Sequence, residues 1–279
     1  MQVTTDVKNP IIRYYGGKWT LAPWIVSHFP SHQGYLEVCG GSASVLLQKP
    51  ISNLETYNDI DKHVVNFFKV IRDNPNELIR RLELTPYARE EWLQAKESCL
   101  DEDPIESARR FLFSSIASIN NLTHEKSSGF RTESFAGQNF KNVVKVFRSS
   151  VMDSIKTVAN RFKYVQIENK EASYVIERYG HKNTLIYFDP PYVKETRSSG
   201  TVYRYEVDNK FHIEIAELLH KTKSFVVVSG YNCQLYETLY GDWYRIDKES
   251  QVNGGGSKTE SLWLSPNIEL NISVQKSLF

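Results

Sequence analysis

The segment from Leu185 to Tyr192 reads Leu-Ile-Tyr-Phe-Asp-Pro-Pro-Tyr, an apolar run that stops at an acid, two prolines and an aromatic residue. A continuous apolar run of this length is typical of a strand buried on both faces of a sheet. Ligands of open α/β sheets bind outside the carboxyl ends of the strands, so the residues after Phe188 lie where a ligand site is expected. The prolines alone would predict no more than a turn.

Strand-like runs and helix-like segments alternate on both sides of this stretch. Seven runs are predicted as strands: Tyr35–Cys39, Leu54–Asn58, Tyr164–Glu168, Thr184–Phe188, Phe225–Ser229, Trp243–Asp247 and Ser261–Leu264. Helical periodicity occurs between several of them: Ser42–Lys49, Lys62–Arg72, Ala172–Tyr179, Lys210–Lys221 and Cys233–Tyr240. This alternation predicts an α/β fold with a Rossmann-like sheet.

The alternation breaks between about residues 75 and 160, where the pattern is helical. The helical segments there are Asn76–Leu84, Arg89–Ser98, Ile105–Asn120 and Asn139–Phe162, interrupted by a polar loop, Thr123–Gly137. We therefore predict one α/β domain formed by residues 1–74 and 161–279. It would carry a helical insertion, residues 75–160.

The composition is that of a globular protein, with 279 residues, 41% hydrophobic and 24% charged. Its three cysteines are far apart and form no metal-binding pairs, which favours a reducing compartment. His28 and His32 have helical spacing but no accompanying thiol or acid, so no metal site is expected. No apolar stretch approaches the roughly 20 residues that cross a bilayer. We expect a cytoplasmic protein with no membrane partner.

The net charge of +1 does not by itself suggest a nucleic-acid partner, but the charge is unevenly distributed. Residues 61–106 contain 7 basic and 11 acidic side chains, whereas residues 109–163 contain 10 basic and 3 acidic ones. A charged stretch is usually a solvated surface. Because this basic stretch coincides with the insertion, contact with phosphates becomes about as plausible as that ordinary interpretation.

The residues Asp189, Pro190, Pro191 and Tyr192 suit chemistry at an exocyclic amine of a nucleic-acid base. Such an amine is a poor nucleophile because its lone pair is delocalised into the ring. A carboxylate that accepts one N–H, and the Pro190 carbonyl that accepts the other, would expose the lone pair. Prolines stiffen the backbone that aims this carbonyl, and the Tyr192 ring would stack on a flipped base.

This motif resembles the catalytic motif of amino-methyltransferases that act on bases. Arg13-Tyr-Tyr-Gly-Gly-Lys18 resembles the opening of Dam-type DNA adenine methylases, and Leu36-Glu-Val-Cys-Gly-Gly-Ser-Ala-Ser-Val45 resembles their cofactor loop. The loop departs from the usual pattern at Val38-Cys39 and at Ala43, where Gly is common. The order of the motifs is that of the alpha group, D12 class. The resemblance implies transfer of a methyl group from S-adenosylmethionine to N6 of a flipped adenine in duplex DNA.

The resemblance also implies site residues. At the strand end Tyr57-Asn-Asp-Ile-Asp61, Asp59 matches the acid that accepts the ribose hydroxyls, while Asp61 is predicted as a helix N-cap. The cofactor-binding residues implied are Tyr14, Lys18, Glu37, Cys39, Gly40, Gly41, Ser42, Asp59, Glu171 and Asp189. Glu37 could orient the cofactor or simply cap the loop. The candidates for DNA contact are Arg13, Lys126, Arg131, Arg197 and Tyr203.

Other interpretations remain open at this point. Asp153 with Glu168 and Lys170 imitates the layout of magnesium-dependent nucleases. A binding protein without turnover, or an enzyme acting on cytosine N4 or on RNA, would share the fold. The recognition sequence, the oligomeric state and a cognate restriction enzyme cannot be read from the sequence.

Overall fold

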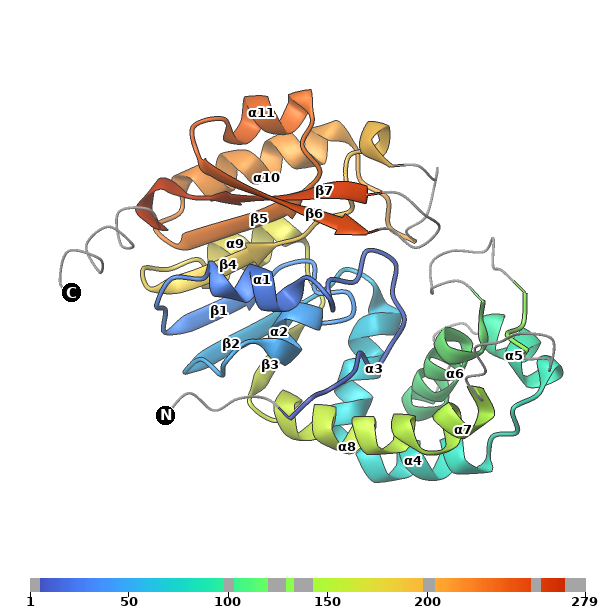
Figure 1. Cartoon of the computed structure of the whole chain (residues 1–279). Helices are drawn as coiled ribbons and strands as arrows, with labels where there is room; N and C mark the ends of the chain where they lie inside the picture. The colour runs from blue at the N-terminus through green and yellow to red at the C-terminus, as the bar shows by residue number, and fades with distance from the viewer. Residues whose placement is uncertain are drawn as a thin grey trace.

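The structure is a computed structural model, and it describes residues 6–97, 103–119, 129–132, 143–197, 204–251 and 257–268. Its centre is a seven-stranded sheet with the order β3-β2-β1-β4-β5-β7-β6 (Figure 1). The strands are β1 (Gly34–Glu37), β2 (Leu54–Asn58), β3 (Val165–Glu168), β4 (Thr184–Phe188), β5 (Phe225–Gly230), β6 (Tyr244–Gln251) and β7 (Ser257–Leu264). All seven predicted strands are present in one sheet, so the predicted Rossmann-like α/β class is confirmed.

Strands β1 to β5 pair in parallel, and β7 pairs antiparallel with both β5 and β6. The β6–β7 hairpin extends beyond the predicted apolar runs. Its outer part consists of polar residues, from Lys248 opposite Glu260 to Gln251 opposite Ser257, so an apolar run could not mark it. An apolar run marks only the part of a strand that is buried on both faces.

Alternate residues of the central strands enter two separate cores, one on each face of the sheet. Tyr35, Leu185 and Val227 face one core, whereas Leu36 and Ile186 face the other. The first core includes α1 (Ala22–Ser27), α2 (Ser44–Gln48) and α3 (Lys62–Asp73). The second lies under α9 (Ala172–Tyr179), α10 (Asn209–Lys221) and α11 (Gln234–Tyr240) (Figure 1).

Two helices differ from the prediction. Helix α1, Ala-Pro-Trp-Ile-Val-Ser, is six residues long, which is too short for a period to be recognised. The predicted helix Asn139–Phe162 is two helices over its described part, α7 (Val143–Arg148) and α8 (Ser150–Phe162), with Ser149 between them. A short 3₁₀ helix, η1 (Lys194–Thr196), follows the Asp-Pro-Pro-Tyr motif.

The insertion contains α4 (Pro75–Leu84), α5 (Arg89–Lys96), α6 (Pro104–Ala117), α7 and most of α8 (Figure 1). Helix α6 ends before the predicted Asn120 because Ser118 pairs with Phe130 in an antiparallel bridge. The predicted boundary at residues 160 and 161 falls inside α8. Phe162 of α8 stacks on Phe68 of α3, with centroids 4.5 Å apart, so this helix ties the insertion to the sheet domain. None of the described helices is long and apolar enough to cross a membrane.

The strand order reverses between β1 and β4, which are neighbours although their paired first residues, Gly34 and Thr184, are 150 positions apart in the sequence. The crevice at such a switch point is where open α/β sheets bind ligands. Glu37 ends β1, Asp59 follows β2, and Asp189 follows β4. The fold therefore brings three acids from distant parts of the sequence to one edge of the sheet.

Candidate active site

Asp189 is held from two sides at the end of β4. Its Oδ1 accepts a hydrogen bond from the Ser229 hydroxyl on β5 at 2.7 Å. Its Oδ2 lies 3.1 Å from the Lys18 ammonium. Ser229 in turn lies 3.0 Å from the Tyr187 hydroxyl. These contacts fix the orientation of the carboxylate before any ligand arrives.

Lys18 comes from the N-terminal segment and is almost fully buried. Its ammonium donates to the Gly16 carbonyl at 2.8 Å and lies 3.7 Å from Glu260 on β7. Burial alone would lower the pKa of Lys18, but Asp189 and Glu260 together raise it above its usual value. The side chain is therefore a fixed positive charge at neutral pH.

Tyr192 is only 7% exposed. Its hydroxyl donates to Glu260, the Lys18 ammonium lies 4.6 Å from its ring centroid, and the Tyr231 ring meets it edge-on. Burial, followed by the nearby Asp189 and Glu260 charges, raises the pKa of the Tyr192 hydroxyl well above its usual value. Lys18 thus lies over the ring that was predicted to stack on a flipped base, and that stacking stays a prediction.

The loop after β1 turns tightly before α2. Gly41 has φ of +46°, which favours glycine, and a Cβ built on Gly40 would lie 2.1 Å from the Tyr57 ring. Ala43, at the position where the resemblance predicts Gly, also has a positive φ of 54°. The loop closes as predicted, at the cost of backbone strain at this alanine.

Glu37 makes the contacts expected of a residue that caps the loop, while its alternative role in orienting the cofactor stays a prediction. Its Oε2 accepts from the Tyr35 hydroxyl at 2.6 Å and from the Leu46 N–H, in the first turn of α2, at 2.9 Å. It also borders the cavity described below. Burial raises its pKa to about 8, although both hydrogen bonds oppose this shift.

Asp59 is bound by the backbone around it. One carboxylate oxygen accepts from the Gly41 N–H at 2.7 Å and the other from the Asp61 N–H at 2.8 Å. Burial raises its pKa to about 6, against the effect of these hydrogen bonds. Asp61 accepts from the His63 N–H at 2.9 Å, so its predicted role as the N-cap of α3 is confirmed.

A single cavity of about 500 Å³ connects these elements. Ligand sites for small molecules typically measure about 300–1,000 Å³. Every predicted cofactor residue lines it, together with two residues of the catalytic motif: Tyr14, Lys18, Glu37, Cys39, Gly40, Gly41, Ser42, Asp59, Glu171, Asp189, Pro190 and Pro191. Glu171 is exposed at the rim, where α9 begins.

The model of the D12 class of N6 adenine-specific DNA methyltransferases matches residues 14–254. The chain belongs to this family. It is a site-specific adenine DNA methyltransferase, and the nuclease and binding-protein interpretations are set aside.

Two curated relatives match nearly the whole chain. The type II methyltransferase M1.LlaDCHI of Lactococcus lactis subsp. cremoris is 25% identical over 91% of both chains. The type II methyltransferase M.MjaIII of Methanocaldococcus jannaschii is 21% identical over 90% of this chain and 94% of the relative. The solved structure of a putative methyltransferase, yhhF from Escherichia coli, covers 94% of this chain and 91% of its own at 12% identity and a TM-score of 0.36.

The residues predicted to contact DNA in this methyltransferase have different placements. Arg13 and Arg131 are 118 positions apart in the sequence but lie close together. Burial lowers the pKa of the Arg13 guanidinium, and the positive charge of Arg131 lowers it further. The Arg13 backbone N–H donates to Ser115 on α6, so the N-terminal segment lies against the insertion (Figure 1). Lys126 and Tyr203 lie outside the described residues.

Arg197 requires a correction. Its guanidinium forms a two-bonded ion pair with Glu206, at 2.7 and 3.1 Å, and its side chain is 3% exposed. Because it is buried and paired with Glu206, the Arg197 guanidinium is not available for contact with a phosphate. The sequence could not reveal this, because no local pattern pairs these two residues, which are nine positions apart.

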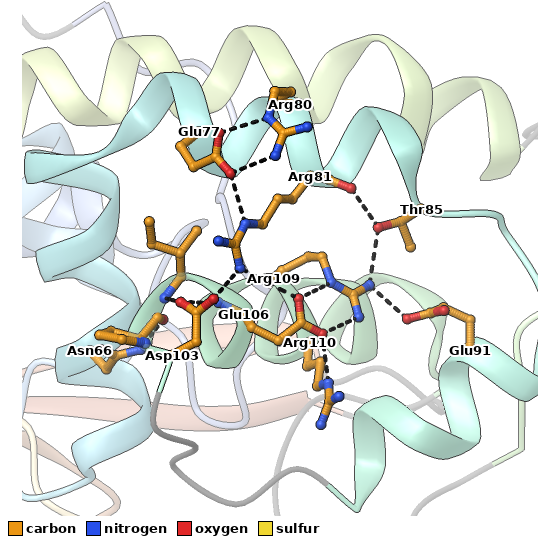
Figure 2. Close-up of polar contacts among 12 residues, drawn as sticks. Asn66, Glu77, Arg80, Arg81, Thr85, Glu91, Asp103, Glu106, Arg109 and Arg110 are labelled. Atoms are coloured by element: carbon orange, nitrogen blue, oxygen red, sulfur yellow. Dashed lines mark hydrogen bonds and ion pairs between the residues drawn. The ribbon is translucent and has the colours of Figure 1, made fainter.

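The charge argument for the insertion also requires a correction, because much of its basic stretch is paired within the protein. Arg109 and Arg110 bind Glu106 of the acidic stretch, and Arg109 also binds Glu91 (Figure 2). Arg148 donates to three carbonyl groups at the end of α4, and Arg161 binds the buried Glu55. Four of the ten basic side chains of this stretch are therefore engaged in contacts within the protein, and they are weaker candidates for contact with DNA than the sequence suggested.

The nuclease-like residues form no metal centre. Glu168 accepts from the Tyr179 hydroxyl at 2.5 Å, and Asp153 lies in the first turn of α8. Within the described segments, no group of three His, Cys, Asp or Glu side chains could hold a metal ion.

Sequence reasoning missed three residues that position the site. Asn58 donates to the Val38 and Lys170 carbonyls and accepts from the Lys170 N–H. These bonds connect the end of β2 with the loops that follow β1 and β3. Ser229 and Glu260 contact the catalytic motif as described above. The one available sequence signal was Glu260 itself, an acid at the start of the apolar run Ser261–Leu264.

Proposed function

We propose that this DNA adenine methyltransferase binds S-adenosylmethionine in the 500 Å³ cavity and methylates N6 of an adenine that is flipped out of duplex DNA to Asp189. One observation carries the proposal. The glycine-rich loop, Asp59 and Asp189 all border the same cavity, so a cofactor held by the first two would have one end beside the third.

The residues present fit this cofactor. When bound, S-adenosylmethionine supplies an electrophilic methyl group on a sulfonium. Asp59 would accept the ribose hydroxyls with the lone pairs that its backbone N–H partners leave over, since a carboxylate offers about four acceptor sites. The tight turn at Gly41 lets the backbone approach a ligand closely. Glu171, at the rim, would lie near the adenine of the cofactor.

Asp189 would accept one N–H of the target amine, and the Pro190 carbonyl would accept the other. This arrangement localises the nitrogen lone pair and directs it at the methyl group. As the new N–C bond forms, the bond between the methyl carbon and the sulfonium sulfur would break and S-adenosylhomocysteine, a neutral thioether, would leave. The amine acquires a positive charge in this step, which the carboxylate of Asp189 would stabilise. Loss of one amine proton to water would then restore a neutral amine. Ser229 and Lys18 keep the carboxylate aimed throughout. No covalent intermediate with the protein is required.

Residues 75–160 would form the target-recognition part, with residues 1–74 and 161–279 as the catalytic domain. Arg13 and Arg131 are our described candidates for DNA contact, since two neighbouring guanidinium groups suit phosphates or guanine edges. Lys126 and Tyr203 stay candidates as well. Both curated relatives are named type II methyltransferases, and we propose the same class here, with a cognate restriction enzyme as partner.

Transfer of a tritiated methyl group to unmethylated duplex DNA, followed by sequencing that maps the modified base, tests the proposal. We expect label on adenine within one short recognition sequence. Label on cytosine, or on RNA only, would contradict it. In parallel, calorimetry should show S-adenosylmethionine binding that Asp59→Ala weakens and Asp189→Ala leaves largely intact.

A further inference from the structure

Glu260 is a buried acid with no assigned role. It lies on β7 and is 2% exposed, although the catalytic cavity does not include it. It comes from the antiparallel hairpin at the far end of the chain, whereas the cavity is built from the parallel strands. A buried carboxylate is costly unless it is paired and hydrogen-bonded, so its partners indicate its purpose.

The partners of Glu260 are two residues of the site. Its Oε1 accepts from the Tyr192 hydroxyl and lies 3.7 Å from the Lys18 ammonium. The same ammonium lies 3.1 Å from Asp189. Lys18 therefore sits between two carboxylates, one that would hold the substrate amine and one that does not face the cavity.

The charges in this cluster depend on one another. Burial raises the pKa of Glu260, the Asp189 charge adds to this effect, and Lys18 opposes it. If Glu260 were neutral or absent, Asp189 would be the only carboxylate of the described residues that forms an ion pair with Lys18. A stronger pair between these two would draw the carboxylate towards the lysine and reduce its capacity to accept a further N–H.

We propose that Glu260 is a positioning residue for methyl transfer, which fixes the Tyr192 ring through its hydroxyl and shares Lys18 with Asp189. The catalytic motif is thereby held by contacts from β7, through Glu260, as well as from β5, through Ser229. This inference rests on the proposed function of Asp189 and Tyr192. It assigns Glu260 no contact with substrate or cofactor.

The test compares Glu260→Gln, Glu260→Ala, Tyr192→Phe and the double variant Tyr192→Phe/Glu260→Gln. Glutamine keeps the size of the side chain and an oxygen for the Tyr192 hydroxyl, but loses the charge that shares Lys18. We expect Glu260→Gln to lower kcat about 100-fold, with the Kd for S-adenosylmethionine nearly unchanged. Because both substitutions break one network, the double variant should lose less than the product of the single effects.

Glu249→Gln is the matched control, because Glu249 is an exposed acid on the same hairpin. It should retain the wild-type kcat and melting temperature. A Glu260→Gln enzyme with wild-type kcat would show that only packing matters and would overturn the proposal. So would independent, multiplicative effects of the two substitutions, or a loss of kcat that merely parallels a loss of folded protein.

Failure of this inference is distinguishable from failure of the proposed function. If the wild-type enzyme labels adenine and Asp189→Ala abolishes labelling while Glu260→Gln is fully active, only the role of Glu260 is wrong. If the wild-type enzyme labels no adenine, the function itself is wrong.

Discussion

Two networks of charged residues, one in the insertion and one at the sheet edge, use the same kinds of side chain in different surroundings. In the insertion, Arg81 joins Glu77 to Asp103, and Glu106 binds Arg109 (Figure 2). The acids of this network are 24–45% exposed. At the sheet edge, the side chains of Lys18, Asp189 and Glu260 are 7%, 16% and 3% exposed.

The comparison teaches that burial, and not the number of charges, decides how strongly an ion pair fixes the geometry around it. Exposed pairs are screened by water and contribute little. A buried pair fixes geometry and changes pKa values, as Lys18 and Glu260 illustrate. The sequence offered both the basic stretch of the insertion and Lys18 as candidates, and in the structure Lys18 is the one that lies beside Asp189.

The largest expected effect concerns a third network, buried but remote from the cavity. Lys49 lies 2.5 Å from Glu55, which also binds Arg161, and all three side chains are nearly inaccessible. Glu55→Gln would leave two buried cations without their counter-charge. We expect urea unfolding to show a loss of about 3–5 kcal/mol. A loss under about 1 kcal/mol would contradict the expectation that a buried ion pair, once broken, costs the most unfolding free energy.

The next effect is the pH dependence of S-adenosylmethionine binding. The pKa of Asp59 is raised to about 6, so the group is ionised above pH 6 and protonated below it. The ionised form accepts hydroxyl groups and favours a sulfonium, so calorimetry should show the affinity falling up to about tenfold per pH unit below pH 6. Asp59→Asn should bind more weakly with a flat profile between pH 5 and 7. A wild-type affinity that rises on acidification would contradict this assignment.

The smallest effect is expected in the exposed network. Glu106→Gln weakens ion pairs with Arg109 and Arg110, but water reaches the carboxylate and Arg109 keeps Glu91. We expect a loss of less than about 1 kcal/mol in urea unfolding, reduced further by added salt. A loss comparable with that of Glu55→Gln would show that the exposure of an ion pair does not predict its contribution to the free energy of unfolding.

The sequence predicted what is encoded locally. The Asp189 motif, the Gly40-Gly41 turn and the Asp59 strand end each combine a strand, a turn and a chemical group within about ten residues, and the structure gathers them around one cavity. The sheet was predictable for the same reason, since continuous apolar runs mark strands that are buried on both faces.

What the sequence missed depends on pairing between distant segments. Arg148 finds its partners 63 to 66 residues away, and Tyr192 finds Glu260 at a separation of 68. No local pattern distinguishes such a side chain from a solvated one. The candidate DNA-contact residues Arg13 and Arg131 are a further example, because they lie close together although they are 118 positions apart in the sequence.

The central claim is that the buried acid after β4 performs the chemistry while the exposed network only supports the fold. Single-turnover methyl transfer to duplex DNA, measured for Asp189→Asn and Glu106→Gln with saturating S-adenosylmethionine, tests it most directly. We predict at least a 100-fold slower transfer for Asp189→Asn and a rate within about twofold of wild type for Glu106→Gln. An Asp189→Asn enzyme that transfers methyl groups at close to the wild-type rate would contradict the account.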